Sequence, residues 1–555
     1  MEVLSPLNCS LSNDFGHERL KTYRATTFGV ISAIVMIVFK IVKMICYQEH
    51  PLKNPLKEPL ISRLANRRIM LRATLLVILS LSLPWVILFF CVAIFYKGIC
   101  SLVIRLKDHH FVSFLDSFDV FWSLEDDASK NVINILGIIE ADSAEMLIEH
   151  VKDKLQGIVT NTEIEKIFYR RHEDHGFYYW RRSPYIDLDQ YVRLVSVCND
   201  QELSVEDLEE VMSELSYQPL PFNDEGLFQV LVTSNRINNS DNNEKGDYGI
   251  IFRIHHSVGD GVALVQFLCQ VLADEKKDEP TLLCMPETYK LRSVMSVTDM
   301  LEMLLKLCEI PICFIDGILR DPDISSIHGQ KLLGKKVYKW IDTDENLFDM
   351  IKEIKVAGKF NFSDILVTAL SHGLKQFFLK EEMDSVIPVP DNVTVILPIR
   401  FKKINYNDSV RFENDFTVSI LDLPVRGDEF DVRDRFKRLR SSADPLTNYY
   451  FLKVCGVLPR DVLQPMFTSS QATMVFSNMP GPHEINIAGG DLKSLVFFVP
   501  NNGTTGLGVT ALCYGGVLRL AAMADSAVVP SSVKLSAILD GMVEEIGRLH
   551  SKYVE

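Results

Sequence analysis

Two apolar stretches stand out near the beginning of the chain. Residues 73–96 carry no charged side chain over 24 positions, and Arg72 and Lys97 flank the run. About 20 apolar residues cross the hydrocarbon core of a bilayer, so we predict a membrane helix here. An earlier stretch, at about 25–46, is shorter and is interrupted by two lysines, and we interpret it as a short span or an interfacial helix. We therefore expect residues 1–110 to anchor the chain in a membrane.

The sequence leaves the orientation of this anchor open. The linker between the two stretches holds six Lys and Arg residues, and the positive-inside rule favours a cytosolic linker. Two full spans would then place the rest of the chain in the lumen. Pro84 lies in the middle of the second stretch and permits a kink, so a hairpin that enters and leaves the cytosolic leaflet is the alternative.

After residue 110 the pattern alternates between period-2 strands and amphipathic helices. This alternation predicts an α/β fold with an N-terminal domain at 111–285, a crossover at 286–345 and a C-terminal domain at 346–555. Within the crossover, the amphipathic stretch 297–319 suits either a membrane surface or the protein core, and we favour the core. The expected strands lie at 131–140, 227–233, 248–255, 392–397, 416–421, 472–477, 508–514 and 517–524. The other expected helices lie at 142–157, 262–273, 347–357, 363–379 and 533–550.

Composition narrows the class of protein. The chain has 58 Lys and Arg against 73 Asp and Glu, a net charge of −15, and 47% hydrophobic residues, which is a globular balance. An acidic total argues against non-specific nucleic-acid binding. The 11 cysteines include no CxxC pair, so neither a disulfide framework nor a zinc site is indicated.

One segment combines residues that suit catalysis. The sequence IHHSVGDG runs from a predicted strand end into a predicted helix. Because side chains alternate along a strand, His255 and His256 point to opposite faces, while Gly259 and Gly261 allow a tight path that returns Asp260 to the strand end. A neutral imidazole at this place is a good general base near pH 7. Asp260 either fixes the imidazole or braces the loop through a buried ion pair. Adjacent histidines diverge, which argues against a metal site, and the chain has no GxSxG nucleophile motif.

This segment resembles the HHxxxDG motif of acyltransferases built like chloramphenicol acetyltransferase. Further segments resemble the wax ester synthase/diacylglycerol acyltransferase family, and specifically its membrane-anchored eukaryotic members. The chain departs from the family pattern at three positions. Ser363 stands where the family has an Asn, Gly226 where it has a Pro, and Cys513 where it has a Ser. The matching segments are SNMPGP at 477–482, FSDIL at 362–366, LPIR at 397–400, LFQV at 227–230 and CYGG at 513–516.

The resemblance implies two chloramphenicol-acetyltransferase-like domains with a tunnel between them. His256 would take the proton of an acceptor hydroxyl, and Asp260 would keep the loop and the imidazole in place. Ser477, Asn478 and Asp364 are the implied candidates for substrate binding or for an oxyanion donor. His255, Gly259 and Gly261 would be structural parts of the motif, with no metal and no cofactor beyond acyl-CoA as co-substrate.

The implied activity is transfer of a fatty acyl group from CoA to a long-chain alcohol, to diacylglycerol, or to both. A non-catalytic lipid-binding protein that kept the fold is the alternative, and an amide-forming condensation domain is disfavoured because no carrier-protein region is present. Because a long-chain alcohol or diacylglycerol partitions into lipid, we also expect the protein to act at a lipid bilayer. We expect an endoplasmic-reticulum location, with the plasma membrane as alternative and the catalytic part in the cytosol. Lys335, Lys336 and Lys339 suit either the CoA phosphates or, more simply, a solvated charge run.

Overall fold

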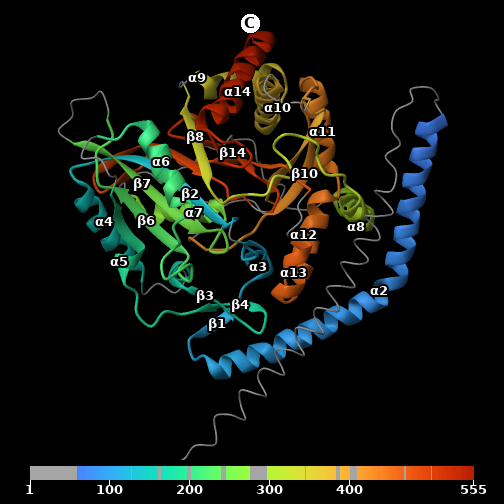
Figure 1. The fold of residues 1–555 in the computed structure, drawn as a ribbon, viewed down its shortest axis with the longest axis horizontal. Coiled ribbons are helices and arrows are strands. Elements are labelled where there is room, and N and C mark those ends of the chain that lie inside the picture. The colour runs from blue at the N-terminus through green and yellow to red at the C-terminus, as the bar shows by residue number, and fades with distance from the viewer. Residues whose placement is uncertain are drawn as a thin grey trace, which may run out of the picture.

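Two six-stranded sheets with helices packed against them form the body of the protein in a computed structural model (Figure 1). The structure describes residues 59–554, with gaps at 127, 160–163, 197–201, 239–244, 275–296, 344–345, 383–387, 401–408, 468–470 and 502.

The helices are α2 (Pro59–Lys107), α3 (Ser117–Trp122), α4 (Ala144–Ile158), η1 (Glu165–Phe168), α5 (Leu188–Tyr191), α6 (Val205–Leu215), α7 (Gly261–Phe267), η2 (Leu268–Leu272), α8 (Val297–Ile318), α9 (Asn346–Ala357), α10 (Phe362–Glu382), α11 (Glu429–Ser441), α12 (Asp444–Cys455), α13 (Arg460–Phe467) and α14 (Ser532–Tyr553). The strands are β1 (Phe111–Phe114), β2 (Val132–Ala141), β3 (Arg170–Asp174), β4 (Phe177–Arg181), β5 (Val192–Val195), β6 (Phe228–Thr233), β7 (Gly246–His255), β8 (Lys336–Asp342), β9 (Asn392–Ile399), β10 (Thr417–Pro424), β11 (Met474–Pro480), β12 (Asn486–Ile487), β13 (Gly490–Phe498), β14 (Leu507–Tyr514) and β15 (Val517–Asp525).

The first large sheet carries the HHSVGDG segment at the end of β7 and has the order β12-β13-β2-β7-β6-β5. Its centre is the antiparallel pair of β2 and β7, in register from Val132 opposite His255 to Ala141 opposite Gly246. Strand β13 comes from the C-terminal half of the chain and pairs with β2. The predicted division at residue 345 therefore does not separate the two sheets, because the C-terminal half completes the N-terminal sheet.

The second large sheet has the order β10-β9-β11-β14-β15-β8. Strand β8 lies inside the segment 286–345 that we expected to be only a crossover, and it pairs antiparallel with β15. Helices α10 and α14 pack closely against each other on this sheet. A Cβ on Gly373 would lie 2.3 Å from the carbonyl oxygen of Ile538, so the close approach of the two helices requires glycine there. A third sheet, β1-β4-β3, has three strands.

Most of the predicted regular elements appear within a few residues of their expected ends. The strand expected at 131–140 is β2, and the helix expected after Asp142 is α4. Ser143 is the residue that caps α4, since its hydroxyl accepts a hydrogen bond from the backbone N–H of Met146 at 3.2 Å. The helix expected at 262–273 is α7 followed by a π-helical turn.

Helix α2 contains the predicted membrane segment. Among the described residues, Met70–Lys107 is the one helical stretch long and apolar enough to cross a membrane. Figure 1 shows α2 bent about halfway along, and Pro84 lies near its middle. The half after the bend packs on the body, where Lys97 Nζ donates a hydrogen bond to the carbonyl oxygen of Gly456 at 3.1 Å. The earlier stretch expected at 25–46 lies outside the described residues.

Helix α8 departs from the expectation that its apolar face is covered by the core. Ile315 near its end is buried, but Leu301, Leu304 and Leu305 are each more than half exposed. The helix contacts α12 and α2. The prediction of a core-facing stripe is therefore wrong for the first turns of the described part of α8.

Candidate active site

His256 follows directly after β7, and hydrogen bonds hold its backbone on both sides. Its N–H donates to the carbonyl oxygen of Asn131 at 2.7 Å. Its carbonyl oxygen accepts from Asn414 Nδ2, also at 2.7 Å. The imidazole lies flat against the indole of Trp122, with ring centroids 3.8 Å apart and an interplanar angle of 4°. The position and the plane of the ring are thus both set by the protein.

The surroundings keep the His256 ring neutral. Burial lowers its pKa to about 3, and its own backbone carbonyl and the Asn414 side chain oppose this shift only in part. The imidazole therefore remains unprotonated, and able to accept a proton, throughout the physiological pH range. Nδ1 is fully buried and has no hydrogen-bond partner among the described residues.

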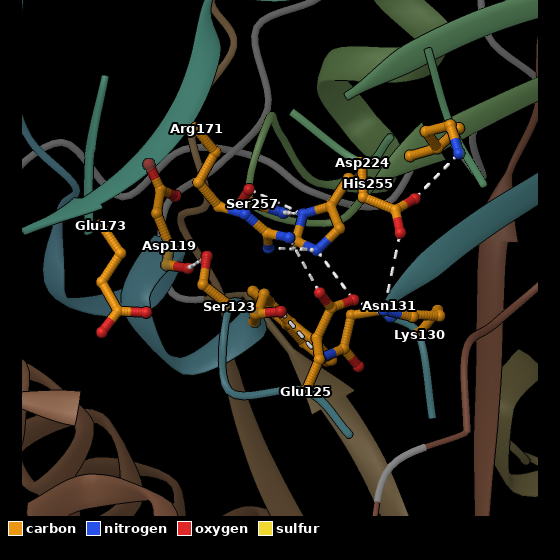
Figure 2. A network of polar contacts seen from close by, with 12 residues as sticks. Asp119, Ser123, Glu125, Lys130, Asn131, Arg171, Glu173, Asp224, His255 and Ser257 are labelled. Carbon is orange, nitrogen blue, oxygen red and sulfur yellow. Dashed lines mark hydrogen bonds and ion pairs between the residues drawn. The ribbon is translucent and has the colours of Figure 1, made fainter. Parts of the chain in front are cut away.

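His255 lies in a separate, closed network. Figure 2 shows its imidazole between Arg171 and Glu125. Its Nε2 lies 3.1 Å from Glu125 Oε1, Arg171 Nη2 lies 2.9 Å from Glu125 Oε2, and the N–H of Ser257 donates to His255 Nδ1 at 3.1 Å. Although burial raises the pKa of Glu125, the adjacent His255 and Arg171 hold it well below its usual range. His255 therefore fixes the strand end and is not available to substrate.

Asp260 braces the loop through a buried ion pair, which was one of the two roles considered from the sequence. Its Oδ1 caps α7 by accepting from the N–H groups of Val262 at 3.1 Å and Ala263 at 3.2 Å. Its Oδ2 accepts from Arg400 Nη1 at 2.6 Å and from the N–H of Asp415 at 3.2 Å. Every named neighbour is a donor, so the acceptor-only carboxylate form fits the site. Burial raises the pKa of Asp260, and Arg400 and these N–H groups oppose that shift.

The C-terminal half supplies the other wall of the loop. Asn414 Nδ2 donates to Asp119 Oδ1 at 2.8 Å as well as to the His256 carbonyl. Lys166 Nζ donates to Asp119 Oδ2 and to the carbonyl oxygen of Phe412, each at 2.9 Å. Burial raises the pKa of Asp119, against the effect of Lys166. Residues 412–416 thus join the catalytic strand to α3 and η1.

An apolar cavity of about 40 Å³ begins beside the motif. Gly261 and Met479 line it together with side chains of β2, β7, α7, β13 and β14. A Cβ on Gly261 would lie 2.2 Å from Met479 Sδ, so glycine at this position permits the close contact between the loop and β11. Met479 belongs to the SNMPGP segment, which the structure therefore brings next to the HHSVGDG loop.

The remaining predicted site residues lie less directly at the site. Ser477 and Asn478 stand on β11 just before Met479, and neither makes a hydrogen bond to the His256 ring. Asp364 lies at the start of α10 with both carboxylate oxygens engaged. Its Oδ2 accepts from the N–H and the side-chain amide of Asn361, both at 3.0 Å, and Arg440 Nη2 lies 2.7 Å from Oδ1. The structure thus assigns Asp364 to the packing of α10 against α11.

The predicted basic cluster is largely engaged within the protein. Lys336 Nζ lies 2.9 Å from Asp525 Oδ2 and is buried, and Lys339 Nζ lies 2.6 Å from Glu209 Oε1. Lys335 is exposed. The two paired lysines do not favour a site for the CoA phosphates. In the part of the chain that the structure describes, no group of three or more His, Cys, Asp or Glu side chains suits a metal ion.

Sequence reasoning missed two residues that contact the base. Trp122 and Asn414 lie 134 and 158 positions from His256, on α3 and just before β10, and no short motif joins them to the histidine. Trp122 is one of only four tryptophans in the chain, which is a weak signal. Asn414 stands beside the predicted strand at 416–421, where a buried amide is unusual enough to draw attention.

Comparisons with known proteins find a matching domain in the C-terminal part of the chain and solved structures with a similar fold. Residues 414–549 match the model of the WS/DGAT C-terminal domain. The wax ester synthase/diacylglycerol acyltransferase from Marinobacter aquaeolei VT8 has a TM-score of 0.52 at 15% identity, covering 79% of this chain and all of that one. The first condensation domain of the calcium-dependent antibiotic synthetase has a TM-score of 0.52 at 12% identity, covering 80% and 97%.

Trichothecene 15-O-acetyltransferase from Fusarium sporotrichioides has a TM-score of 0.51 at 13% identity, covering 79% and 94% of the two chains. No curated protein sequence matches the chain. The structural likenesses show the shared fold, and the matched C-terminal domain agrees with the motif resemblance. The chain therefore has an α/β fold like that of chloramphenicol acetyltransferase, and its residues 414–549 are similar to the C-terminal domain of the wax ester synthase/diacylglycerol acyltransferases.

Proposed function

We propose that the protein is an acyl-CoA-dependent O-acyltransferase that esterifies a long-chain alcohol, diacylglycerol, or both. The observation that carries this proposal is a buried, unprotonated His256 beside an apolar cavity, with its backbone and its ring plane both fixed. A general base must be present in its unprotonated form and within reach of the proton that it takes. The matched C-terminal domain and the fold support acyl transfer as the reaction class.

In the proposed reaction, His256 Nε2 takes the proton of the acceptor hydroxyl as its oxygen attacks the thioester carbonyl carbon. A tetrahedral oxyanion forms, the carbon–sulfur bond breaks, and the proton passes from the imidazolium to the departing sulfur, releasing the CoA thiol. Asp260 does not touch the ring and acts by holding the loop through Arg400. Ser477 and Asn478 remain our candidates for the oxyanion donor, because β11 approaches the loop at Met479.

The apolar cavity suits the acyl chain. Its lining has almost no polar surface, and Gly261 of the catalytic loop stands at its edge. An alkyl chain gains roughly 0.8 kcal/mol for each CH₂ group that it buries, so the short part of the chain that fits a cavity of about 40 Å³ would help to hold the thioester near the base. We place the catalytic body on the cytosolic face of the endoplasmic-reticulum membrane, where acyl-CoA is available, with α2 as the anchor.

A two-acceptor assay tests the proposal. Membranes that carry the full chain receive labelled palmitoyl-CoA with either hexadecanol or diacylglycerol. We expect label in wax ester or in triacylglycerol, lost in His256→Gln and kept in His109→Gln, a change at an exposed histidine. Absence of transfer to both acceptors from folded protein would contradict the proposal and favour the non-catalytic lipid-binding alternative.

A further inference from the structure

Helix α8 presents an apolar stripe to the outside of the protein. Leu301, Leu305, Cys308 and Ile312 follow one another at spacings of three and four residues, which places them on one face of the helix. The two leucines are 57% exposed and Ile312 is 43% exposed. A soluble surface helix places its apolar stripe against the core and its polar residues in water. In this part of α8 the arrangement is reversed.

The stripe continues toward the membrane helix. Asp316 lies one turn after Ile312 on the same side of α8, and its Oδ1 accepts from Arg72 Nε at 2.7 Å. Arg72 is the residue at which the uncharged run of α2 begins. Figure 1 shows α8 next to α2, and the two helices are in contact. The apolar surfaces of the two helices therefore adjoin at this ion pair.

The half of α2 after its bend carries a similar stripe. Seven of its exposed large apolar residues recur at spacings of three and four along the helix and continue well beyond the predicted span. The opposite side of this half packs on the body through Phe89, Phe90 and Ala93. The seven residues of this stripe are Trp85, Leu88, Val92, Phe95, Ile99, Leu102 and Leu106, and Val86, Ile87, Ile94 and Val103 are exposed beside it.

Aromatic rings form a path from α8 to the base. Phe314 of α8 lies 5.4 Å from Phe451 of α12, which lies 5.8 Å from Phe467 of α13. Phe467 lies 5.1 Å from Phe121 of α3, whose neighbour Trp122 is the ring stacked on His256. All five rings are partly exposed, so each offers apolar surface along the path.

From these observations we infer that one exposed face of α8 is seated in the lipid leaflet that holds α2. This face is defined by Leu301, Leu304, Leu305, Cys308 and Ile312. The acceptor leaves the bilayer at this face and follows the ring path to His256. The occupant of this face is thus phospholipid, for two reasons. The five residues that define the face are uncharged, with the exposed Glu309 at its edge, and the face joins the apolar run of α2 at the Arg72–Asp316 ion pair. Only the part that concerns the acceptor rests on the proposed function.

A fluorescent label tests the seating without any assay of activity. Cys91 and the cysteines outside the described residues, Cys9, Cys46, Cys198 and Cys284, are changed to serine, so that Cys308 remains as the exposed thiol. The full chain is labelled and placed in phosphatidylcholine vesicles with or without nitroxide-bearing lipid. We expect the Cys308 probe to be quenched at least threefold more than a probe at Val533→Cys, an exposed position on α14.

Quenching at Cys308 no greater than at the α14 control would overturn the seating. A probe that is shielded equally in detergent would show that another part of the chain covers the face, and shielding that depends on protein concentration would show a second copy. Either of these results would also overturn the inference.

Activity separates the acceptor path from the proposed function. The double variant Leu301→Asp, Leu305→Asp is compared with Val533→Asp, a control at an exposed valine on α14. We expect the double variant to raise the apparent KM for vesicle-borne hexadecanol at least tenfold, while its rate with a water-soluble short-chain alcohol stays unchanged. An unchanged KM for hexadecanol would refute the path. Loss of transfer to both acceptors in the unaltered chain would refute only the proposed function.

Discussion

Replacing Asp260 by Asn separates the two roles of this side chain, which are to cap α7 and to pair with Arg400. The amide oxygen of Asn is still able to cap α7, because the N–H groups of Val262 and Ala263 lie on the Oδ1 side. The other atom becomes an NH₂ group that faces two donors, Arg400 and the Asp415 N–H. The variant thus keeps the helix cap and loses the ion pair.

The structure sets the size of the effect. Removing one partner from a buried ion pair costs about 3–5 kcal/mol, because the other charge is left without compensation. The Asp260 side chain is 7% exposed, but that of Arg400 is 22% exposed and is able to take up some water. We therefore expect a smaller loss of about 2–3 kcal/mol in the free energy that keeps the loop closed. A difference of 1.4 kcal/mol is tenfold in an equilibrium constant, so the loop would open roughly 30- to 150-fold more often.

Hydrogen exchange read by mass spectrometry measures this opening directly. We expect amides in 411–416 to exchange roughly 30- to 150-fold faster in Asp260→Asn, while those in the first turn of α7 remain protected. Asp260→Ala removes the cap as well and should expose that first turn, at a cost of about 1 kcal/mol more. The double variant Asp260→Asn, Arg400→Met should recover most of the lost protection, because no charge is left unpaired. Equal protection of 411–416 in Asp260→Asn and the native chain would refute this account.

Three further predictions concern His256 and the cavity beside it. The pKa of His256 is about 3 in the folded protein, below its unfolded value of about 6.5. As the pH falls, the unfolded chain therefore takes up the proton first, and the free energy of unfolding decreases between these two pH values. Lowering the pH from 7 to 5 should cost about 2 kcal/mol more in the native chain than in His256→Gln, measured by denaturant unfolding in detergent; an equal pH dependence would contradict the buried neutral ring. Trp122→Ala opens the ring to water and should move the acid limb of the rate–pH profile up toward about 6.5, unlike Trp122→Phe; an unmoved limb would show that the indole does not control the environment of the base. Leu268→Trp fills the apolar cavity and should shift the acyl-CoA preference from palmitoyl toward shorter chains, read from product ratios, whereas an unchanged preference would place the acyl chain elsewhere.

The sequence predicted the local geometry of the HHSVGDG loop because the information for that geometry is local. The strand end, the two glycines and the capping carboxylate all lie within seven residues, and the structure places His255, His256 and Asp260 as that pattern indicates. The bracing partner Arg400 was noted only as part of a strand-end motif. Its role depends on where the second domain docks, which no local pattern records.

The parts that sequence reasoning missed depend on long-range packing. Strand β13 joins the first sheet although it follows four strands of the second, and β8 joins the second sheet from inside the expected crossover. Both strands have ordinary strand patterns, and nothing in them names the sheet that they enter. Asp364 shows the converse, since a motif that matches the family by sequence holds two helices together instead of forming part of the site. The stripe of α8 was predicted by its spacing, but the choice between core and membrane needed the exposed surface of the folded chain.

The rate of acyl transfer by His256→Ala tests the central claim most directly. The full chain in nanodiscs is given palmitoyl-CoA and its preferred acceptor, and the rate is compared with that of the native protein at equal folded fraction. General-base catalysis contributes roughly 10²- to 10⁴-fold, so we predict a loss of at least about 100-fold with the thermal unfolding midpoint of the body still measurable. A variant that folds and transfers acyl groups within about tenfold of the native rate would show that His256 is not the base.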